Sequence, residues 1–318
     1  MSELFRDVDG RCVSPRGSVV CIGAFDGLHP GHRTLIGHTL ARARELDLDA
    51  AVLAFEPIPR EFFLGQRAPA RIASWRDRFE RLRAMGVDVV GMLRFNAALA
   101  AMEAETFIER LLVQRLNARE VWTGADFRFG KGRRGDVELL KEQGAIHGFA
   151  ACVIDDHLDG SRRVSSSAIR EALAAGDLAT AERLLGRQYS IANTVVRGRQ
   201  LGRQLGYPTA NLRLAGRRPA LGGIFAVWVH GVAAHPWPGV ASLGTRPTIE
   251  GVEPLLEAHL FDFDGDLYGR RIEVEFVAKL RDEERFNDLP ALVAQMDRDA
   301  AEARAILSAP AAQSRKSA

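Results

Sequence analysis

Two histidines lie close together near the start of the chain, in the segment Gly23-Ala-Phe25-Asp26-Gly-Leu-His29-Pro-Gly31-His32. Glycine permits tight turns and lets the backbone approach a ligand closely. A helix that begins here would place two imidazoles beside free backbone N–H groups, and both kinds of group favour phosphate oxygens. The segment therefore predicts a site for a triphosphate, although it is not a Walker A sequence. The alternative is that His29 and His32 cap the helix or bind a metal ion.

Two later segments are also rich in small and basic residues. Residues 123–135 directly follow a predicted strand and contain Asp126 and Phe127. Residues 163–171 contain Arg163, Ser166 and Ser167. Serines before an amphipathic stretch are ordinary helix caps, and a glycine- and arginine-rich stretch is often a solvated loop. The arginines beside the serines favour a second anion-binding helix end.

A third group of polar residues lies in the C-terminal half, in the segment Gly202-Arg-Gln-Leu-Gly-Tyr-Pro-Thr209-Ala-Asn211. On an extended backbone the side chains of Thr209 and Asn211 project to the same face. A hydroxyl and an amide carbonyl side by side can bind Mg²⁺ together with nucleotide phosphates. The preceding loop, residues 198–202, could direct backbone N–H groups at a phosphate. The alternative is a proline-containing turn in which both side chains make local hydrogen bonds.

One carboxylate stands in an apolar setting, at Glu257 in the segment Leu-Leu-Glu257-Ala-His-Leu-Phe. A carboxylate inside an apolar strand is either held by a structural salt bridge or positioned to act as a base.

The elements that must position these residues follow two different patterns of predicted secondary structure. Up to about residue 187 apolar strands alternate with helices. The expected strands are residues 18–23, 50–55, 87–93, 118–123 and 149–154. Helices are expected from near Gly31, after a cap at Ser74, and around residues 105–116. The alternation predicts a parallel sheet with helices on both faces and a ligand beyond the carboxyl ends of its strands.

After Gly186 the chain becomes rich in short β segments separated by turn residues. These segments are residues 190–198, 223–232, 239–244, 255–263 and 270–280. The pattern predicts a small antiparallel barrel or sandwich. One helix is expected from residue 289 to about 307, and residues 311–318 are expected to form a disordered tail. We therefore predict two domains, residues 1–187 and 188–318.

Length and composition support this division. A chain of 318 residues exceeds the size at which one core usually keeps growing. The net charge of +2, with acidic and basic residues mixed, gives no footprint for nucleic acid or an anionic membrane. The N-terminus has no signal-peptide core and no apolar run is long enough to span a bilayer. Three cysteines without metal-type spacing complete the expectation of a cytoplasmic protein.

The three segments of the first half resemble the FAD synthetase domain of the bacterial bifunctional riboflavin kinase/FAD synthetases, an HxGH nucleotidyltransferase. The resemblance implies a Rossmann-like fold and attack of the FMN phosphate on the α-phosphate of ATP, which releases pyrophosphate. It implies that His29 and His32 act in catalysis, and that the nucleotide is bound by Gly23, Phe25, Asp26, Gly31, Arg163, Ser166 and Ser167. The loop with Asp126 and Phe127 would lie near flavin and nucleotide. Asp126 stands where the family often has Asn, and Ser167 where Thr is common.

The second half resembles the flavokinase domain, a small β-barrel. The resemblance covers about residues 188–307 and rests on five motifs in the same order: GYPTAN, GTRPT, Glu-x-His, DLYG and LRDExxF. It implies that Glu257 takes the proton of the riboflavin 5′-hydroxyl as that oxygen attacks the γ-phosphate of ATP. Gly202, Thr209 and Asn211 would then bind ATP, with Mg²⁺ held by Thr209 and Asn211.

The combined resemblance predicts an enzyme that makes FMN from riboflavin and FAD from FMN. Its partners would be the small molecules riboflavin, FMN, FAD and ATP, with Mg²⁺ as cofactor, and its oligomeric state is left open. Two alternatives are an enzyme with one activity, whose other module only binds flavin, and a flavin-responsive regulatory protein. A third is an HxGH transferase for another phosphate substrate, which leaves the β-rich half unexplained.

Overall fold

The computed structural model describes residues 2–155, 158–159, 162–198, 202, 205–214, 218–248 and 251–309. It divides into two compact units, Met1–Pro69 with Ala73–Ser165 and Ala70–Ile72 with Ser166–Ala318. Helices α7 (Ser166–Ala174) and α8 (Leu178–Leu185) belong to the second unit. The predicted extents of the two catalytic modules, residues 1–187 and 188–318, stay predictions. The expected tail, residues 311–318, lies outside the described residues.

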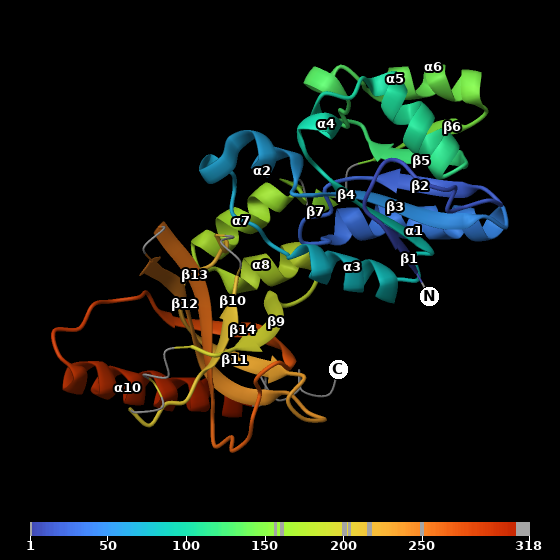
Figure 1. Cartoon of the computed structure of the whole chain (residues 1–318). Coiled ribbons are helices and arrows are strands. Elements are labelled where there is room, and N and C mark those ends of the chain that lie inside the picture. The colour runs from blue at the N-terminus through green and yellow to red at the C-terminus, as the bar shows by residue number, and fades with distance from the viewer. Residues whose placement is uncertain are drawn as a thin grey trace. The chain divides into compact units, whose positions relative to one another are not determined.

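The first unit is built on a parallel sheet of six strands in the order β1-β4-β3-β2-β5-β6 (Figure 1). The strands are β1 (Glu3–Phe5), β2 (Ser18–Ile22), β3 (Asp49–Glu56), β4 (Val89–Arg94), β5 (Ala118–Gly124) and β6 (Ala150–Ile154). All five neighbouring pairs run parallel. The five expected strands are thus confirmed, and the short edge strand β1 is added. The chain order reverses between β2 and β5, which is where ligands bind in sheets of this kind.

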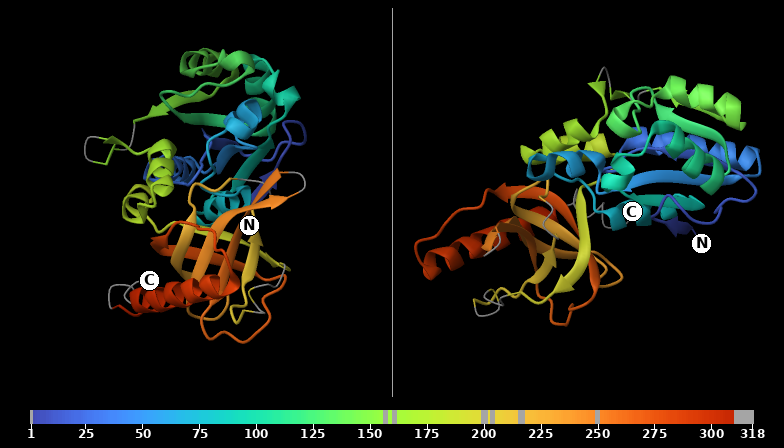
Figure 2. Two further views of the ribbon diagram at one scale, coloured as in Figure 1. Left: turned by 90° about the vertical axis from the view of Figure 1, so that its left-hand side faces the viewer. Right: turned by 45° about the horizontal axis from the view of Figure 1, so that its top comes forward.

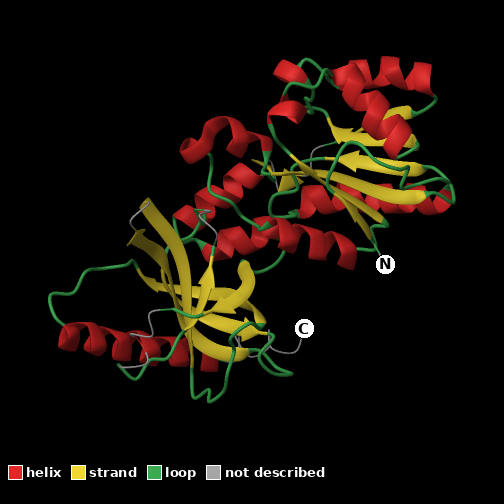
Figure 3. Ribbon diagram, in the orientation of Figure 1, coloured by secondary structure: helices red, strands yellow, loops and turns green. Residues whose placement is uncertain are grey.

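Helices cover both faces of this sheet, as the alternation of strands and helices predicts (Figure 3). Successive residues of a strand point to opposite faces. Accordingly Val19 and Cys21 of β2 pack in one apolar core with α1 (Pro30–Glu45) and α3 (Trp75–Ala84). Val20 and Ile22 pack in another, with α5 (Ala104–Phe107) and α6 (Val137–His147).

The helix expected around residues 105–116 has an unexpected form. It begins as α5 and continues as a π-helix, η2 (Ile108–Arg115). The remaining short elements of this unit are α2 (Pro59–Leu64), η1 (Gly65–Arg67), α4 (Ala97–Ala100), η3 (Lys131–Arg133), β7 (Leu158–Asp159) and β8 (Arg162–Arg163). The cap expected at Ser74 is confirmed, because its hydroxyl accepts a hydrogen bond from the Asp77 backbone N–H.

The second unit contains a closed barrel in the order β10-β13-β12-β11-β14-β9 (Figure 2). Its strands are β9 (Ser190–Val196), β10 (Ala210–Arg213), β11 (Gly223–His230), β12 (Trp237–Thr248), β13 (Gly251–Leu260) and β14 (Arg271–Arg281). Every pairing is antiparallel. Of the two predicted forms, barrel and sandwich, the structure therefore has the barrel.

The predicted C-terminal helix is α10 (Leu289–Ser308), and it packs along the outside of the barrel. Ala300, Ala303 and Leu307 of this helix form an apolar cluster with Trp228 of β11 and with Phe261. In the part of the chain that the structure describes, no helix is both long and apolar enough to cross a membrane.

Two candidate active sites

The first site begins where β2 ends. The backbone of Phe25 and Leu28 has positive φ, at 50° and 47°, so residues 23–32, here called the HxGH segment, turn sharply. The Phe25 ring is fully buried beneath Gly23, where a Cβ would lie 3.0 Å from it. His29 then occupies the N-cap position of α1, but its side chain makes no capping hydrogen bond. The structure therefore does not support a capping role for the His29 ring.

The two histidine rings lie against each other. Their centroids are 3.7 Å apart at an interplanar angle of 22°, and His29 is only 6% exposed. Burial, and then the neighbouring His29 and Arg78, hold the pKa of His32 well below its ordinary value. Because His32 is therefore neutral near pH 7, its ring offers one N–H donor rather than two.

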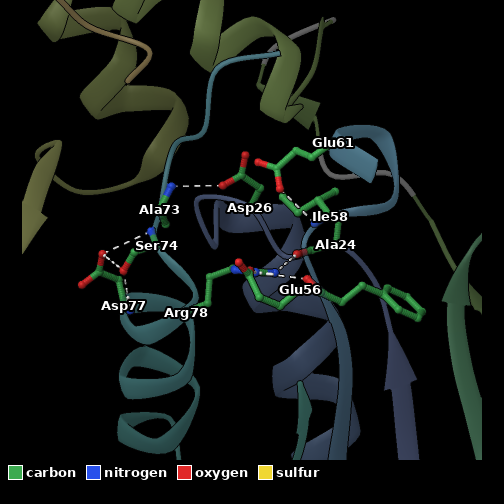
Figure 4. A network of polar contacts seen from close by, with 10 residues as sticks. Ala24, Asp26, Glu56, Ile58, Glu61, Ala73, Ser74, Asp77 and Arg78 are labelled. Atoms are coloured by element: carbon green, nitrogen blue, oxygen red, sulfur yellow. Dashed lines mark hydrogen bonds and ion pairs between the residues drawn. The ribbon is translucent and has the colours of Figure 1, made fainter. Parts of the chain in front are cut away.

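A buried network of charged groups lies behind the HxGH segment (Figure 4). Arg78, in the first turns of α3, is 0% exposed and Glu56, at the end of β3, is 6% exposed. The Arg78 guanidinium donates to the Glu56 carboxylate, to the Ala24 carbonyl at 2.8 Å and to the Phe55 carbonyl at 3.1 Å. One cation thus ties the ends of β2 and β3 together.

The start of α3 holds the same segment at a second point. The Asp26 carboxylate, 1% exposed, accepts the backbone N–H of Ala73 at 3.0 Å (Figure 4). The next residue, Ser74, is the helix cap, so the contact comes from the rigid beginning of the helix. The sequence prediction included Asp26 but missed Arg78. The one sequence feature that could have indicated Arg78 is its spacing of four residues from the apolar Leu82, which places both on the buried face of an amphipathic helix.

The loop after β5 carries the other predicted residues of this unit. Since β5 pairs with β2, this loop and the HxGH segment leave the same edge of the sheet. Asp126 lies in the loop and forms a salt bridge of 2.6 Å with Arg163 of β8. The hydrogen bond from Arg163 is the main cause that lowers the pKa of Asp126. The Phe127 ring stacks on Phe129, with centroids 5.4 Å apart.

A cluster of aromatic rings at the ends of β3 and β4 was not assigned a role from the sequence. Phe55, Phe62, Phe63 and Phe95 meet edge to face, at centroid distances between 5.2 and 5.9 Å. Phe62 and Phe63 of α2 are 38% and 64% exposed. The carboxyl edge of the sheet therefore offers an apolar aromatic surface as well as polar groups. The predicted Ser166 and Ser167 begin α7, in the second unit.

The second site lies on two neighbouring strands of the barrel. In the pairing of β10 with β13, Asn211 stands directly opposite Glu257. On the other side of β13, Glu257 faces Ser242 of β12. The structure thus brings together two residues, 46 positions apart in the printed sequence, that sequence patterns assigned to one site.

The amide of Asn211 is buried and directed by its neighbours. Its Nδ2 donates to the Thr209 carbonyl at 3.1 Å and to the Thr209 hydroxyl at 3.2 Å. Its Oδ1 is buried and has no hydrogen-bond partner among the described residues. A Cβ added at Gly198 would lie 2.4 Å from this oxygen, so only glycine leaves the space around it open.

Two cavities meet at Thr209. The larger, of about 640 Å³, is lined by Gly202, Thr209, Glu257 and by apolar residues that include Val240, Phe286 and Met296. The smaller, of about 430 Å³, is lined by Gly198, Thr209, Asn211 and the Asp264–Tyr268 loop. Of the predicted loop 198–202, only the two glycines are described. Gly202 accepts the backbone N–H of Tyr207 at 2.7 Å and lies so close to it that a Cβ would reach 2.3 Å from the Tyr207 carbonyl.

An ion pair that the sequence did not predict, between a partly buried arginine and a buried aspartate, lies in the wall of the larger cavity. Arg281 of β14 donates twice to Asp299 of α10, at 3.0 and 2.8 Å, and Asp299 is 4% exposed. The hydrogen bond to Asp299 is the main cause that raises the pKa of Arg281. The pair therefore fixes α10 against the last strand of the barrel.

Comparison with known proteins gives the family of this chain. A family model described as FAD synthetase matches residues 12–168, and one described as riboflavin kinase matches residues 185–307. The bifunctional riboflavin kinase/FMN adenylyltransferase of Pseudomonas fluorescens is 46% identical over 314 residues, which cover 98% of this chain and 99% of that protein.

The protein of the same description from Escherichia coli (strain K12) is 43% identical over 303 residues, which cover 95% of this chain and 97% of its own. A crystal structure described as a macrolide-efflux protein from Streptococcus pneumoniae matches with a TM-score of 0.75 at 29% identity, covering 94% of this chain and 97% of that one. Both domain matches and both relatives point to the same pair of activities. This chain belongs to the family of bifunctional riboflavin kinases/FMN adenylyltransferases.

Proposed function

We propose that the barrel phosphorylates riboflavin to FMN and that the α/β unit carries the core of the site that adenylylates FMN to FAD, with ATP as co-substrate in both steps. Membership of the family supports both activities. The observation that carries the assignment of residues is the pairing of Asn211 with Glu257 beside Thr209, where the two cavities meet.

In the barrel, we assign the larger cavity to riboflavin and the smaller one to the phosphates of ATP. The apolar residues of the larger cavity suit a flat flavin ring. Glu257 would accept the proton of the 5′-hydroxyl while the oxygen forms its bond to the γ-phosphorus and ADP leaves. Phosphoryl transfer depends mostly on alignment and charge neutralisation. Thr209 and Asn211, which line the smaller cavity, are therefore proposed to hold the nucleotide, together with Gly202, which lines the larger cavity with Thr209.

We further propose that Thr209 and Asn211 hold Mg²⁺. The ion prefers oxygen ligands, and Asn211 Oδ1 is a buried oxygen without a hydrogen-bond partner in the described structure. The Thr209 hydroxyl accepts a hydrogen bond from the nitrogen of the same amide, and Gly198 leaves the space around the amide oxygen open. When bound, the ion would neutralise negative charge on the phosphates.

In the α/β unit, the FMN phosphate would attack the α-phosphorus of ATP, and pyrophosphate would leave. His29 and His32 are proposed to contact the phosphates, because their stacked rings stand at the start of α1, where backbone N–H groups also favour anions. The nucleotide would rest on Gly23, Phe25, Asp26 and Gly31. The reaction then needs alignment and fixed donors rather than a covalent intermediate.

Arg163, Ser166 and Ser167 are proposed to hold the triphosphate end of ATP. Arg163 is paired with Asp126, so a phosphate would have to compete with that carboxylate. The Asp126–Phe127 loop and the exposed rings of Phe62 and Phe63 are proposed to receive the flavin, since flat aromatic ligands stack on such surfaces. We place the enzyme in the cytoplasm, because its three cysteines are free, as a reducing compartment keeps them.

One experiment tests the whole proposal. The purified protein is incubated with riboflavin, ATP and Mg²⁺, and the flavins are separated by chromatography over time. We expect FMN first and FAD afterwards. FMN alone would show that the α/β unit does not adenylylate FMN. In a parallel incubation FMN is supplied in place of riboflavin. If this FMN were converted to FAD while riboflavin was not converted, the barrel would only bind flavin and would not phosphorylate it. No product from either flavin would favour a regulatory protein.

A further inference from the structure

One residue of the barrel site has no role in the function proposed above. His259 follows Glu257 by two positions on β13, so both side chains lie on the same face of the strand. Both line the larger cavity. His259 is half-buried, and its ring meets the rings of Tyr207 and Phe261 at centroid distances of 5.0 and 5.9 Å.

The ring makes one polar contact, and that contact defines its chemical form. His259 Nδ1 lies 2.9 Å from the carbonyl oxygen of Pro208. A carbonyl only accepts, so Nδ1 must carry the proton. Burial, followed by the charge of Arg304, outweighs the effect of this hydrogen bond and lowers the pKa of His259. The ring is therefore neutral, with Nε2 unprotonated.

The contact between His259 and the Pro208 carbonyl matters because Pro208 directly precedes Thr209. The next residue is Thr209, whose hydroxyl accepts from Asn211 and which borders both cavities. Proline has no N–H, so its carbonyl is the only backbone group through which Pro208 can be held. The residue before it, Tyr207, donates its hydroxyl to Asp297 of α10. The segment 207–209 is thus tied to β13 through His259 and to α10 through Tyr207.

We propose that His259 is a positioning residue for phosphoryl transfer: it holds the Pro208 carbonyl and so fixes Thr209 relative to Glu257 on its own strand. The proposal rests on the kinase function assigned above to Glu257 and Thr209. A displacement of about 1 Å can cost on the order of 100-fold in rate when a reaction depends on alignment. A hydrogen bond that fixes this distance therefore affects catalysis although neither of its atoms takes part in the reaction.

Three substitutions separate positioning from other roles. In His259→Asn the amide nitrogen replaces Nδ1 and can still donate to Pro208, whereas in His259→Gln it falls nearer the place of Nε2. His259→Ala removes both nitrogens. We expect His259→Asn to keep the kcat of FMN formation within about threefold, and the Gln and Ala variants to lose about 10- to 100-fold. The loss should appear in kcat and in the KM for MgATP, and riboflavin binding, followed by flavin fluorescence, should change less than twofold.

The chain supplies its own controls. FAD formation from FMN, measured on the same preparations, should be unchanged in all three variants. His235→Ala, which alters an exposed histidine between β11 and β12, should leave both activities unchanged.

Two results would overturn the inference. If all three variants lost activity equally and their pH profiles changed, His259 would transfer a proton itself. If all three matched the unaltered protein, the contact with Pro208 would be without consequence for catalysis. If the unaltered protein formed no FMN, the proposed kinase function would fail, and this inference would fail with it. That result differs from one in which the unaltered protein is active and the His259 variants have the same activity.

Discussion

The two candidate sites hold the segments that we propose to bind phosphate by different means. In the α/β unit the HxGH segment is fixed from behind by the buried cation Arg78 and by the Asp26–Ala73 hydrogen bond. In the barrel, segment 207–209 is fixed by the half-buried rings of His259 and Tyr207. A buried ion is costly to leave unpaired, while a half-exposed hydrogen bond is replaced by water at little cost.

We infer that a segment of a candidate site can be fixed either by a buried ion pair, which contributes strongly to the stability of the fold, or by half-exposed hydrogen bonds, which contribute little. Breaking the first arrangement should impair folding and catalysis together. Breaking the second should impair catalysis almost alone. The following predictions test this contrast.

The largest effect is expected from removing the two groups assigned to chemistry. Glu257→Gln should lower FMN formation by about 100- to 10,000-fold and leave FMN-to-FAD conversion intact, because the amide cannot accept the proton. His29→Ala should do the reverse. Both rates are measured on each variant by chromatography. Near-normal kinase turnover in Glu257→Gln would remove Glu257 from the role of base, and an equal fall of both steps in a folded variant would refute two separate sites.

Removal of Arg78 should affect stability and catalysis at once. Arg78→Met breaks the buried ion pair with Glu56, and breaking such a pair from one side typically costs about 3–5 kcal/mol of folding free energy. The double variant Glu56→Leu/Arg78→Met should regain most of that stability, but FAD formation should stay reduced, because the Ala24 carbonyl still lacks its donor. Urea unfolding and FAD formation measure the two effects.

The control is Arg76→Met, which breaks an exposed pair with Glu80 on the same helix and should change stability by less than about 1 kcal/mol. Full adenylylation by the double variant would show that Arg78 serves folding only.

Asn211 should control the requirement for Mg²⁺. We expect Asn211→Ala to lower FMN formation about 10- to 100-fold at a fixed concentration of Mg²⁺, as loss of a contact to a charged group predicts, and to be partly restored by excess Mg²⁺. Asn193→Ala, which alters a half-buried asparagine on β9 of the same barrel, is the matched control. A Mg²⁺ dependence like that of the unaltered protein would contradict the assignment.

The smallest effect is expected at Asp126. Asp126→Asn removes the carboxylate that competes for Arg163, so the KM for ATP in FAD formation should fall by about two- to fivefold, in line with the small energy of exposed pairs. Arg128→Gln, which breaks the neighbouring pair with Asp136, should leave that KM unchanged. An increase in KM would instead mean that Asp126 itself assists nucleotide binding.

Much of the fold was predictable because its strands are short apolar runs between turn residues. β2 and β3 are nearly continuous apolar segments, so they were found within two residues. β1 could not be predicted, because it has only three residues with polar neighbours and its pairing with the distant β4 is not visible in the local sequence. The π-helix η2 has i→i+5 hydrogen bonds and a slightly longer period than an α-helix, and its eight residues are too few for apolar periodicity to separate the two.

The candidate sites could be located in part from the sequence. The residues that we propose to act in catalysis, such as Glu257 and His29, stand out because their types do not fit their apolar or turn surroundings. The residues that hold them in place do not stand out in the sequence. Arg78 and Glu56 are 22 residues apart and each fits an ordinary pattern. The partner of His259 is a backbone carbonyl, which no residue type encodes.

The position of Thr209 on the rim of both cavities has a consequence for inhibition. If the two cavities bind the substrates as we propose, a molecule that joined a flavin-like ring to a phosphate mimic through a linker passing Thr209 would occupy both cavities at once. Linking two ligands in this way gains affinity through effective concentration when the linker matches the span. Such a bisubstrate compound would compete with riboflavin and with ATP in the barrel and leave adenylylation of supplied FMN untouched.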